Sequence, residues 1–125
     1  MAKVLIIDDS AVMRKIIQRN IMQSGLLVDS FVEAGDGREG LEKATTGDVD
    51  LILCDWNMPN MTGIDFVKAL RGSGQKNNIP IVMVTTEGSD AKIEEAKNSG
   101  ANGYLTKPFT PEQLKAKLGN FLQIK

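Results

Sequence analysis

The side chains best suited to chemistry are three acids, a hydroxyl and a lysine, each placed where an apolar run of the sequence ends. These are Asp8 and Asp9 after 4–7, Asp55 after 51–54, Thr85 after 81–84, and Lys107 after 103–106. If such carboxylates cluster, each pair at about 5 Å repels by roughly 3 kcal/mol at an effective dielectric near 20. A lysine offsets part of this repulsion. Hard oxygen ligands from few residues also suit Mg²⁺, which commonly joins carboxylates to a phosphate. We therefore expect a Mg²⁺ site at which a carboxylate attacks phosphorus.

The residue types that are absent or rare narrow the chemistry further. The chain has no histidine and a single cysteine, Cys54. Ser/His and Cys/His catalysis, multi-cysteine zinc sites and an internal disulfide are thereby excluded. Because Cys54 lies in an apolar run, we expect it to be an inert core thiol.

Charge and hydropathy limit the partners. With 15 basic and 16 acidic side chains the net charge is −1, so we expect neither nucleic acid nor an anionic membrane as a partner. No segment approaches the roughly 20 apolar residues of a membrane span, and the amino-terminal run is too short for a signal peptide. We therefore expect a cytoplasmic protein.

Five segments have the character of strands. Continuous apolar runs at 4–7, 51–54 and 81–84 are typical of strands buried on both faces of a parallel sheet, and weaker candidates lie at 30–34 and 103–106. In an open α/β sheet, ligands bind beyond the carboxyl ends of the strands. The five polar side chains should therefore meet at one edge.

Helical periods separate the strands. Ser10 is a suitable N-cap and Gly25 a suitable end for a first helix, whose apolar stripe is Met13, Ile16, Ile17 and Ile21. Shorter helices are expected at 38–46, 64–71 and 90–99. The fourth of the five helices offers only Ile93 and Ala96 as an apolar pair, so we expect it to be weakly anchored.

The last helix has the clearest signals. Thr110 can cap it, Pro111 suits its first position, and Gln113 completes a capping box. Its expected buried stripe is Leu114, Leu118, Phe121 and Leu122. Five strands alternating with five helices, with no linker or repeat between them, predict one α/β domain with a parallel sheet.

At this point the sequence resembles the receiver domains of two-component response regulators. The resemblance covers the whole chain, 1–125, and is carried by Asp8-Asp9, Asp55-Trp56-Asn57-Met58-Pro59, Gly63, Thr85 and Lys107-Pro108. It implies a flavodoxin-like, doubly wound, five-stranded parallel sheet in the order 2-1-3-4-5 with five helices. Within the family the segments 55–61, 85–87, 103–104 and 107–109 point to the single-domain receivers of chemotaxis.

The resemblance implies a set of metal ligands. Asp9 and Asp55 would ligate Mg²⁺ directly, the backbone carbonyl of Asn57 would be the third protein ligand, and Asp8 would act mainly through a water. Mg²⁺ is the expected cofactor. Asn57 and Glu87 lie where they could influence the access of water to an acyl phosphate.

The resemblance also implies how phosphate is handled. Asp55 would be the phosphorylated carboxylate, Lys107 would pair with a phosphoryl oxygen, and the Thr85 hydroxyl would turn toward another. The Lys107–Pro108 peptide bond is expected to be cis. The protein would catalyse its own phosphorylation and dephosphorylation, and would not turn over an external substrate as an ordinary enzyme does.

The expected partners follow from the same resemblance. They are a histidine kinase of the chemotaxis type as phosphodonor, a flagellar motor switch protein as target, and a phosphatase. The protein itself is expected to be a monomer. The output face would be made by the fourth helix, fifth strand and fifth helix, with Tyr104, Ile93 and Lys117 as its switch and partner residues. From the residues alone, Tyr104 could equally be a partly buried strand aromatic, and Lys117 a solvated helix charge.

Several alternatives remain open. A phosphorelay receiver, or a receiver cut from a longer regulator, would carry the same residues. An Asp-nucleophile phosphohydrolase of the haloacid dehalogenase type would place an acid where Asn57 stands. A flavin-binding module is disfavoured by Asp8 and Asp9, because its phosphate cradle needs amides and hydroxyls there. A receiver-like scaffold that no longer accepts phosphate would have no need for clustered acids.

Overall fold

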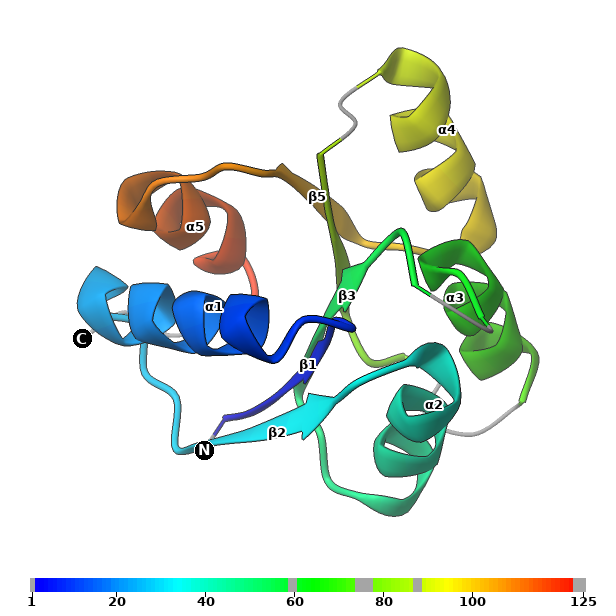
Figure 1. Cartoon of the computed structure of the whole chain (residues 1–125), viewed down its shortest axis with the longest axis horizontal. Helices are drawn as coiled ribbons and strands as arrows, with labels where there is room; N and C mark the ends of the chain where they lie inside the picture. Colours follow the sequence, from blue (N-terminus) through cyan, green and yellow to red (C-terminus); the bar gives the residue numbers. More distant parts are fainter. Residues whose placement is uncertain (1, 59–60, 74–77, 87–88, 123–125) are drawn as a thin grey trace.

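The apolar runs pair side by side as one parallel sheet. In a computed structural model of the chain, which describes residues 2–58, 61–73, 78–86 and 89–122, the five strands have the order β2-β1-β3-β4-β5. Their bounds are β1 Lys3–Ile7, β2 Ser30–Ala34, β3 Leu51–Asp55, β4 Ile81–Thr85 and β5 Gly103–Thr106. The predicted fold class, strand order and element order are all confirmed (Figure 1).

Helices cover both faces of the sheet. Their bounds are α1 Ala11–Ser24, α2 Gly37–Thr46, α3 Gly63–Gly72, α4 Asp90–Ser99 and α5 Pro111–Leu118. Helices α1 and α5 lie together on one face, and α2, α3 and α4 on the other (Figure 1). No helix among the described residues is long and apolar enough to cross a membrane.

The alternation of side chains along the central strands produces two cores. In β1, Leu5 and Ile7 face the α2–α3–α4 side, whereas Val4 and Ile6 face the α1–α5 side, and all four are buried. Because both faces are covered, the strand has to be apolar throughout, as its sequence is. The sheet is therefore a rigid support for the residues at its carboxyl edge.

The capping signals in the sequence act as expected. The Ser10 side chain accepts a hydrogen bond from the Met13 amide, and Gly25 ends α1 in the left-handed region with φ of 87°. Thr110 and Gln113 form the predicted capping box, with Pro111 at the start of α5. These caps satisfy amides that a helix start leaves without a partner.

Two details of the predicted helices are wrong. Ile16 is 40% exposed, because α1 faces the sheet through Ile17 and Ile21, and Ile16 lies one residue off that stripe. Helix α5 ends at Leu118, so Phe121 and Leu122 belong to the turn that follows, although both still pack against the α1–α5 core.

Candidate functional site

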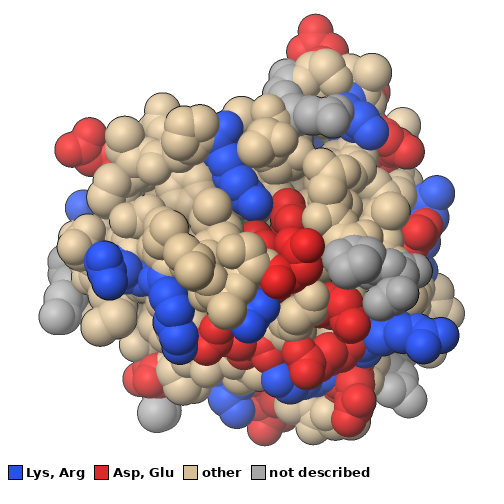
Figure 2. Space-filling view, in the orientation of Figure 1, with Lys and Arg blue, Asp and Glu red and all other residues tan. Residues whose placement is uncertain are grey.

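The polar residues predicted to converge do lie together at the carboxyl edge of the sheet. Asp55 and Thr85 are the last residues of β3 and β4, Asp8 directly follows β1, and Lys107 directly follows β5. Asp8, Asp55 and Thr85 are buried, with exposed fractions of 2%, 8% and 1%, whereas Asp9 is exposed. The centre of the face seen in Figure 2 is accordingly acidic, where β1 and β3 end in Figure 1.

The three carboxylates form a compact group. Asp8, Asp9 and Asp55 each offer an oxygen, and these oxygens lie within 4.8 Å of one another. Such a set of hard oxygen donors, open to solvent on the Asp9 side, fits a small divalent cation that retains several waters. The group could therefore bind a metal ion.

Lys107 is the cation that holds this group together. Its Nζ donates to Oδ2 of Asp8 at 3.2 Å and to Oδ1 of Asp55 at 3.3 Å. Burial and the neighbouring Asp8 charge raise the pKa of Asp55 above its ordinary value, and Lys107 opposes that shift. One ammonium thus faces two buried carboxylates, which leaves the site short of positive charge.

The backbone around Lys107 places its side chain. Its amide donates to the Thr85 carbonyl at 2.6 Å, which ties the end of β5 to the end of β4. The Lys107–Pro108 peptide bond is cis, as expected from the family resemblance. Thr85 has its side chain buried in the same corner.

The loop after Asp55 packs closely against the start of α3. The Gly63 amide donates to the Trp56 carbonyl at 2.8 Å. A Cβ added at Gly63 would lie 2.3 Å from the Asp55 carbonyl oxygen and 2.7 Å from Cε of Met83. Only a residue without a side chain fits this approach, so Gly63 sets the position of the loop that carries Asp55.

A second ion-pair group supports the loop after β1. The Nη1 of Arg14 donates to the Asp8 carbonyl at 2.5 Å, and its Nε pairs with Glu33 at 2.9 Å. Lys15 also pairs with Glu33, at 2.8 Å. Hydrogen bonds from Lys15 and Arg14 lower the pKa of Glu33 to about 2. This group was not predicted from the sequence, because Arg14 and Lys15 lie among the polar residues of α1 and Glu33 lies in β2.

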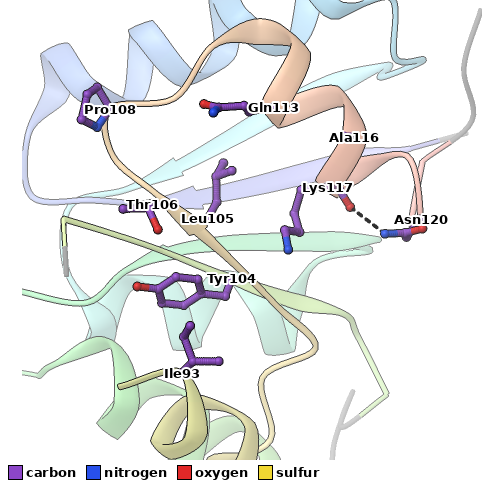
Figure 3. A pocket seen from close by; sticks show the side chains of 9 residues that line it. All are labelled: Ile93, Tyr104, Leu105, Thr106, Pro108, Gln113, Ala116, Lys117 and Asn120. Atoms are coloured by element: carbon purple, nitrogen blue, oxygen red, sulfur yellow. Dashed lines mark hydrogen bonds between the residues drawn. The ribbon is translucent and has the colours of Figure 1, made fainter. Parts of the chain in front are cut away.

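The residues predicted for the output face also lie together. Ile93, Tyr104 and Lys117 line one groove of about 600 Å³ between α4, β5 and α5. Figure 3 shows the Tyr104 ring beside Ile93, with the Lys117 side chain reaching toward the same groove from α5. Ala96 is the one described residue of α4 that is fully buried, in keeping with the weak anchoring expected for this helix.

The remaining residues singled out in the sequence differ in how far they are buried. Cys54 is fully buried, and burial raises the pKa of its thiol, as expected for an unreactive core cysteine. Met58 and Trp56 are buried core residues, with 8% and 6% exposed. Asn57 is exposed just beyond Asp55. Pro59, Asn60 and Glu87 lie outside the described residues.

Fold and site together define a receiver, a parallel α/β domain with a paired-acid cluster and a lysine at the carboxyl edge of its sheet. The profile of the response regulator receiver domain family matches residues 4–119, and the chain belongs to this family. Several similar proteins are named as chemotaxis proteins. The chain is 43% identical to Chemotaxis protein CheY1 of Helicobacter pylori over 117 residues, which are 93% of each chain.

Two further comparisons agree. The chain is 41% identical to Chemotaxis protein CheY of Pseudomonas aeruginosa over 116 residues, covering 93% of this chain and 92% of that one. The solved structure of the chemotaxis response regulator CheY4 of Vibrio cholerae superposes with a TM-score of 0.86 at 45% identity, covering 98% of this chain and 99% of that one. The chain is therefore similar to CheY-type chemotaxis response regulators over nearly its whole length.

Proposed function

We propose that residues 1–125 act as one phosphoacceptor domain, a single-domain chemotaxis response regulator that takes a phosphoryl group onto Asp55 from a phosphohistidine of a histidine kinase. The observation that carries this proposal is the double ion pair of Lys107 with Asp8 and Asp55 inside a cluster of three carboxylates. A structural salt bridge needs one acid. Two more acids beside it suit a site that receives a cation and a phosphoryl group.

The neighbouring carboxylates of Asp8 and Asp9 differ in their hydrogen bonds and in their exposure to solvent. Asp8 already accepts from the Ser10 amide at 2.9 Å through Oδ1 and from Lys107 through Oδ2. Asp9 is exposed, which leaves it accessible to a cation. As the resemblance to receiver domains implies, we assign Mg²⁺ to Asp9, Asp55 and the Asn57 carbonyl, with Asp8 acting through a water, and the exposure of Asp9 supports this assignment. Bound there, Mg²⁺ would neutralise negative charge on the transferring phosphoryl group.

The transfer itself needs little from the protein beyond placement. A carboxylate oxygen of Asp55 attacks phosphorus, the phosphorus–nitrogen bond of the donor breaks, and the imidazole nitrogen keeps the electron pair. Asp55 needs no general base, because it acts as an ionised carboxylate. Lys107 lies next to Asp55 Oδ1 and stabilises the charge on the phosphoryl oxygens. Dephosphorylation is a separate step: water attacks phosphorus, the bond between phosphorus and the Asp55 oxygen breaks, the carboxylate keeps the electron pair, and inorganic phosphate and a proton are released.

Phosphorylation would be transmitted to the groove between α4, β5 and α5. Thr85 ends β4 beside Asp55, and its backbone oxygen holds the Lys107 amide. When its hydroxyl turns toward the phosphoryl group, the adjoining space opens to the ring of Tyr104 on β5. The groove lined by Ile93, Tyr104 and Lys117 would then fit a flagellar motor switch protein, and a phosphatase would end the signal. We propose that the protein works as a cytoplasmic monomer.

Intact-mass spectrometry after exposure to acetyl phosphate tests the central step. We expect the gain of one phosphoryl group that requires Mg²⁺ and is lost in Asp55→Asn. Asp65→Asn, which alters an exposed acid of α3, is the matched control and should be phosphorylated like the wild type. A stable protein that gains no phosphoryl group from acetyl phosphate or from a chemotaxis kinase would refute the proposal.

The same samples separate the proposal from a phosphohydrolase. A receiver gains and loses one phosphoryl group per Asp55, whereas an Asp-nucleophile phosphohydrolase turns over many equivalents of a phosphate monoester such as p-nitrophenyl phosphate. Multiple turnover that depends on Asp55 would favour the hydrolase.

A further inference from the structure

A side chain in the first turn of α4 contacts the segment 56–58 that follows Asp55, which we call the phosphoacceptor loop. The Nζ of Lys92 lies over the ring of Trp56, 4.8 Å from its centroid. This is within the distance at which an ammonium is attracted to the face of an indole. Trp56 directly follows Asp55 and is only 6% exposed, so its ring is held firmly by the core. Lys92 therefore connects α4, which has one fully buried residue, to a buried aromatic residue of the site.

Among the described residues, the fully buried part of α4 lies away from this end. Its buried side chain is Ala96, near its carboxyl end, and Ile93 is half-buried. The carboxyl end is secured by Arg71 of α3, whose Nε donates to the Gly100 carbonyl at 3.1 Å and whose Nη2 donates to Oδ1 of Asn102 at 2.8 Å. The two ends of α4 are thus held differently, by hydrogen bonds at one end and by the Lys92 contact at the other.

The position of Lys92 is not favoured by the dipole of α4. Lys92 is the third residue of α4, and its amide donates to the Ser89 side chain that caps the helix. The amino end of a helix carries partial positive charge and favours acids, so a lysine there is unfavourable. The contact with Trp56 supplies a reason for a cation at this place.

We infer that Lys92 is a positioning residue that couples the phosphoacceptor loop to α4 through Trp56. Its signalling role rests on the proposed function, whereas the contact does not. The connection runs from Asp55 to the adjacent Trp56, from the indole to Lys92, and from Lys92 to the adjacent Ile93 in the groove. It does not pass through Thr85 or Tyr104. A change of the loop at Asp55 and a change in the position of α4 must therefore influence each other.

Amide hydrogen exchange of α4 tests the contact in the protein without ligand. In Lys92→Met we expect exchange at residues 93–96 to become about two- to fivefold faster, which corresponds to the loss of an exposed cation–π pair. Lys92→Arg retains a cation over the ring and should match the wild type. Lys68→Met removes an exposed lysine from α3 and should leave residues 93–96 unchanged. Loss of the charge at residue 92 relieves the helix dipole and would slow exchange, so faster exchange reports the lost contact.

A second arm tests the coupling, with Mg²⁺ and beryllium fluoride as a phosphoryl analogue. In the wild type these ligands should change exchange at residues 93–96, and in Lys92→Met the change should be at least halved. In a Trp56→Leu background, Lys92→Met should have no further effect, because the ring is already gone. Exchange in Lys92→Met that equals the wild type, with and without the ligands, would overturn the inference. If calorimetry shows that the ligands do not bind, the proposed function fails, and the unliganded comparison still decides the contact.

Discussion

The Nζ of Lys107 lies 3.3 Å from Oδ1 of Asp55, although 52 residues separate the two in the chain. The same Nζ is 3.2 Å from Asp8, so one ammonium serves two buried acids while Asp9 lies beside them. This relationship explains both the stability of the site and its chemistry. The cluster holds together because of Lys107, and it retains an excess of negative charge that a divalent cation would relieve.

Removal of the Lys107 charge should impair phosphorylation and stability together. In Lys107→Met we expect phosphorylation by acetyl phosphate to slow by about two orders of magnitude, the usual cost of losing one group that stabilises transition-state charge. Because two acids are left unpaired, we also expect the free energy of unfolding in chelator to fall by about 2 kcal/mol, somewhat less than for a fully buried pair. Urea denaturation and intact-mass time courses measure the two effects. Lys68→Met, an exposed lysine of α3, is the control, and an unchanged rate in Lys107→Met would contradict the assigned role.

The raised pKa of Asp55 predicts a pH dependence with a definite sign. Folding raises the pKa of this carboxyl, so in chelator the folded state binds more protons than the unfolded state around that pKa. The contribution of Asp55 to stability therefore decreases as pH rises through its folded pKa. Asp55→Asn should therefore be more stable than the wild type at pH 7, and the difference should decrease as pH falls through the raised pKa of Asp55 toward the ordinary value of a carboxyl.

Urea denaturation in chelator between pH 4 and 8 checks this expectation. Glu94→Gln removes an exposed acid of α4 and should show no such difference. Saturating Mg²⁺ should stabilise the wild type, by about 2.7 kcal/mol at 100 times the dissociation constant, and Asp55→Asn less. Equal melting temperatures with chelator and with Mg²⁺ would show that the cluster does not bind the ion.

A pair of glycines in α3 provides a matched comparison. A Cβ at Gly63 would meet the Asp55 carbonyl oxygen at 2.3 Å, whereas one at Gly72, at the other end of the helix, meets nothing within 4 Å. Gly63→Ala should therefore displace the phosphoacceptor loop, lower the free energy of unfolding by about 2 kcal/mol or more, and slow phosphorylation. Gly72→Ala should be neutral or should stabilise the protein by up to about 1 kcal/mol. Similar stabilities for the two variants would mean that the loop adapts to a side chain at residue 63.

The sequence predicted the sheet well because burial on both faces leaves a strong signal. The three continuous apolar runs became β1, β3 and β4, each longer than expected by one residue. The extra residues at the ends of β3 and β4 are Asp55 and Thr85, which pair within the sheet although their side chains are polar. Helix faces were less certain, as Ile16 shows, because a one-residue step on a helix turns a side chain by about 100°.

The sequence predicted those site residues that stand at the ends of strands. It did not predict contacts that depend on how helices pack against the sheet. Asp8, Asp55 and Lys107 could be brought together because parallel strands end at one edge. The contacts of Arg14 with Glu33 and of Lys92 with Trp56 join segments whose distance depends on how helices lie against the sheet. Hydrophobic periodicity contains no information on such pairs. These contacts are seen only in the structure.

Glu33 should make the protein more sensitive to acid, through a contact that also supports the site. Arg14 and Lys15 lower the pKa of Glu33 from 4.5 to about 2, so the stabilisation is present above pH 4.5 and is lost as pH falls toward 2. The Glu33 side chain is 30% exposed, and solvent screening reduces the contribution to about 1 kcal/mol. Glu33→Gln should therefore be less stable than the wild type at pH 7 and equal to it near pH 2, as measured by urea denaturation. Glu42→Gln, an exposed acid of α2, should not change the profile.

The same substitution should also affect the metal site, because Arg14 donates a hydrogen bond to the Asp8 carbonyl as well as pairing with Glu33. We expect Glu33→Gln to weaken Mg²⁺ binding about two- to threefold, as measured by calorimetry. Unchanged affinity would show that Arg14 holds the loop without Glu33.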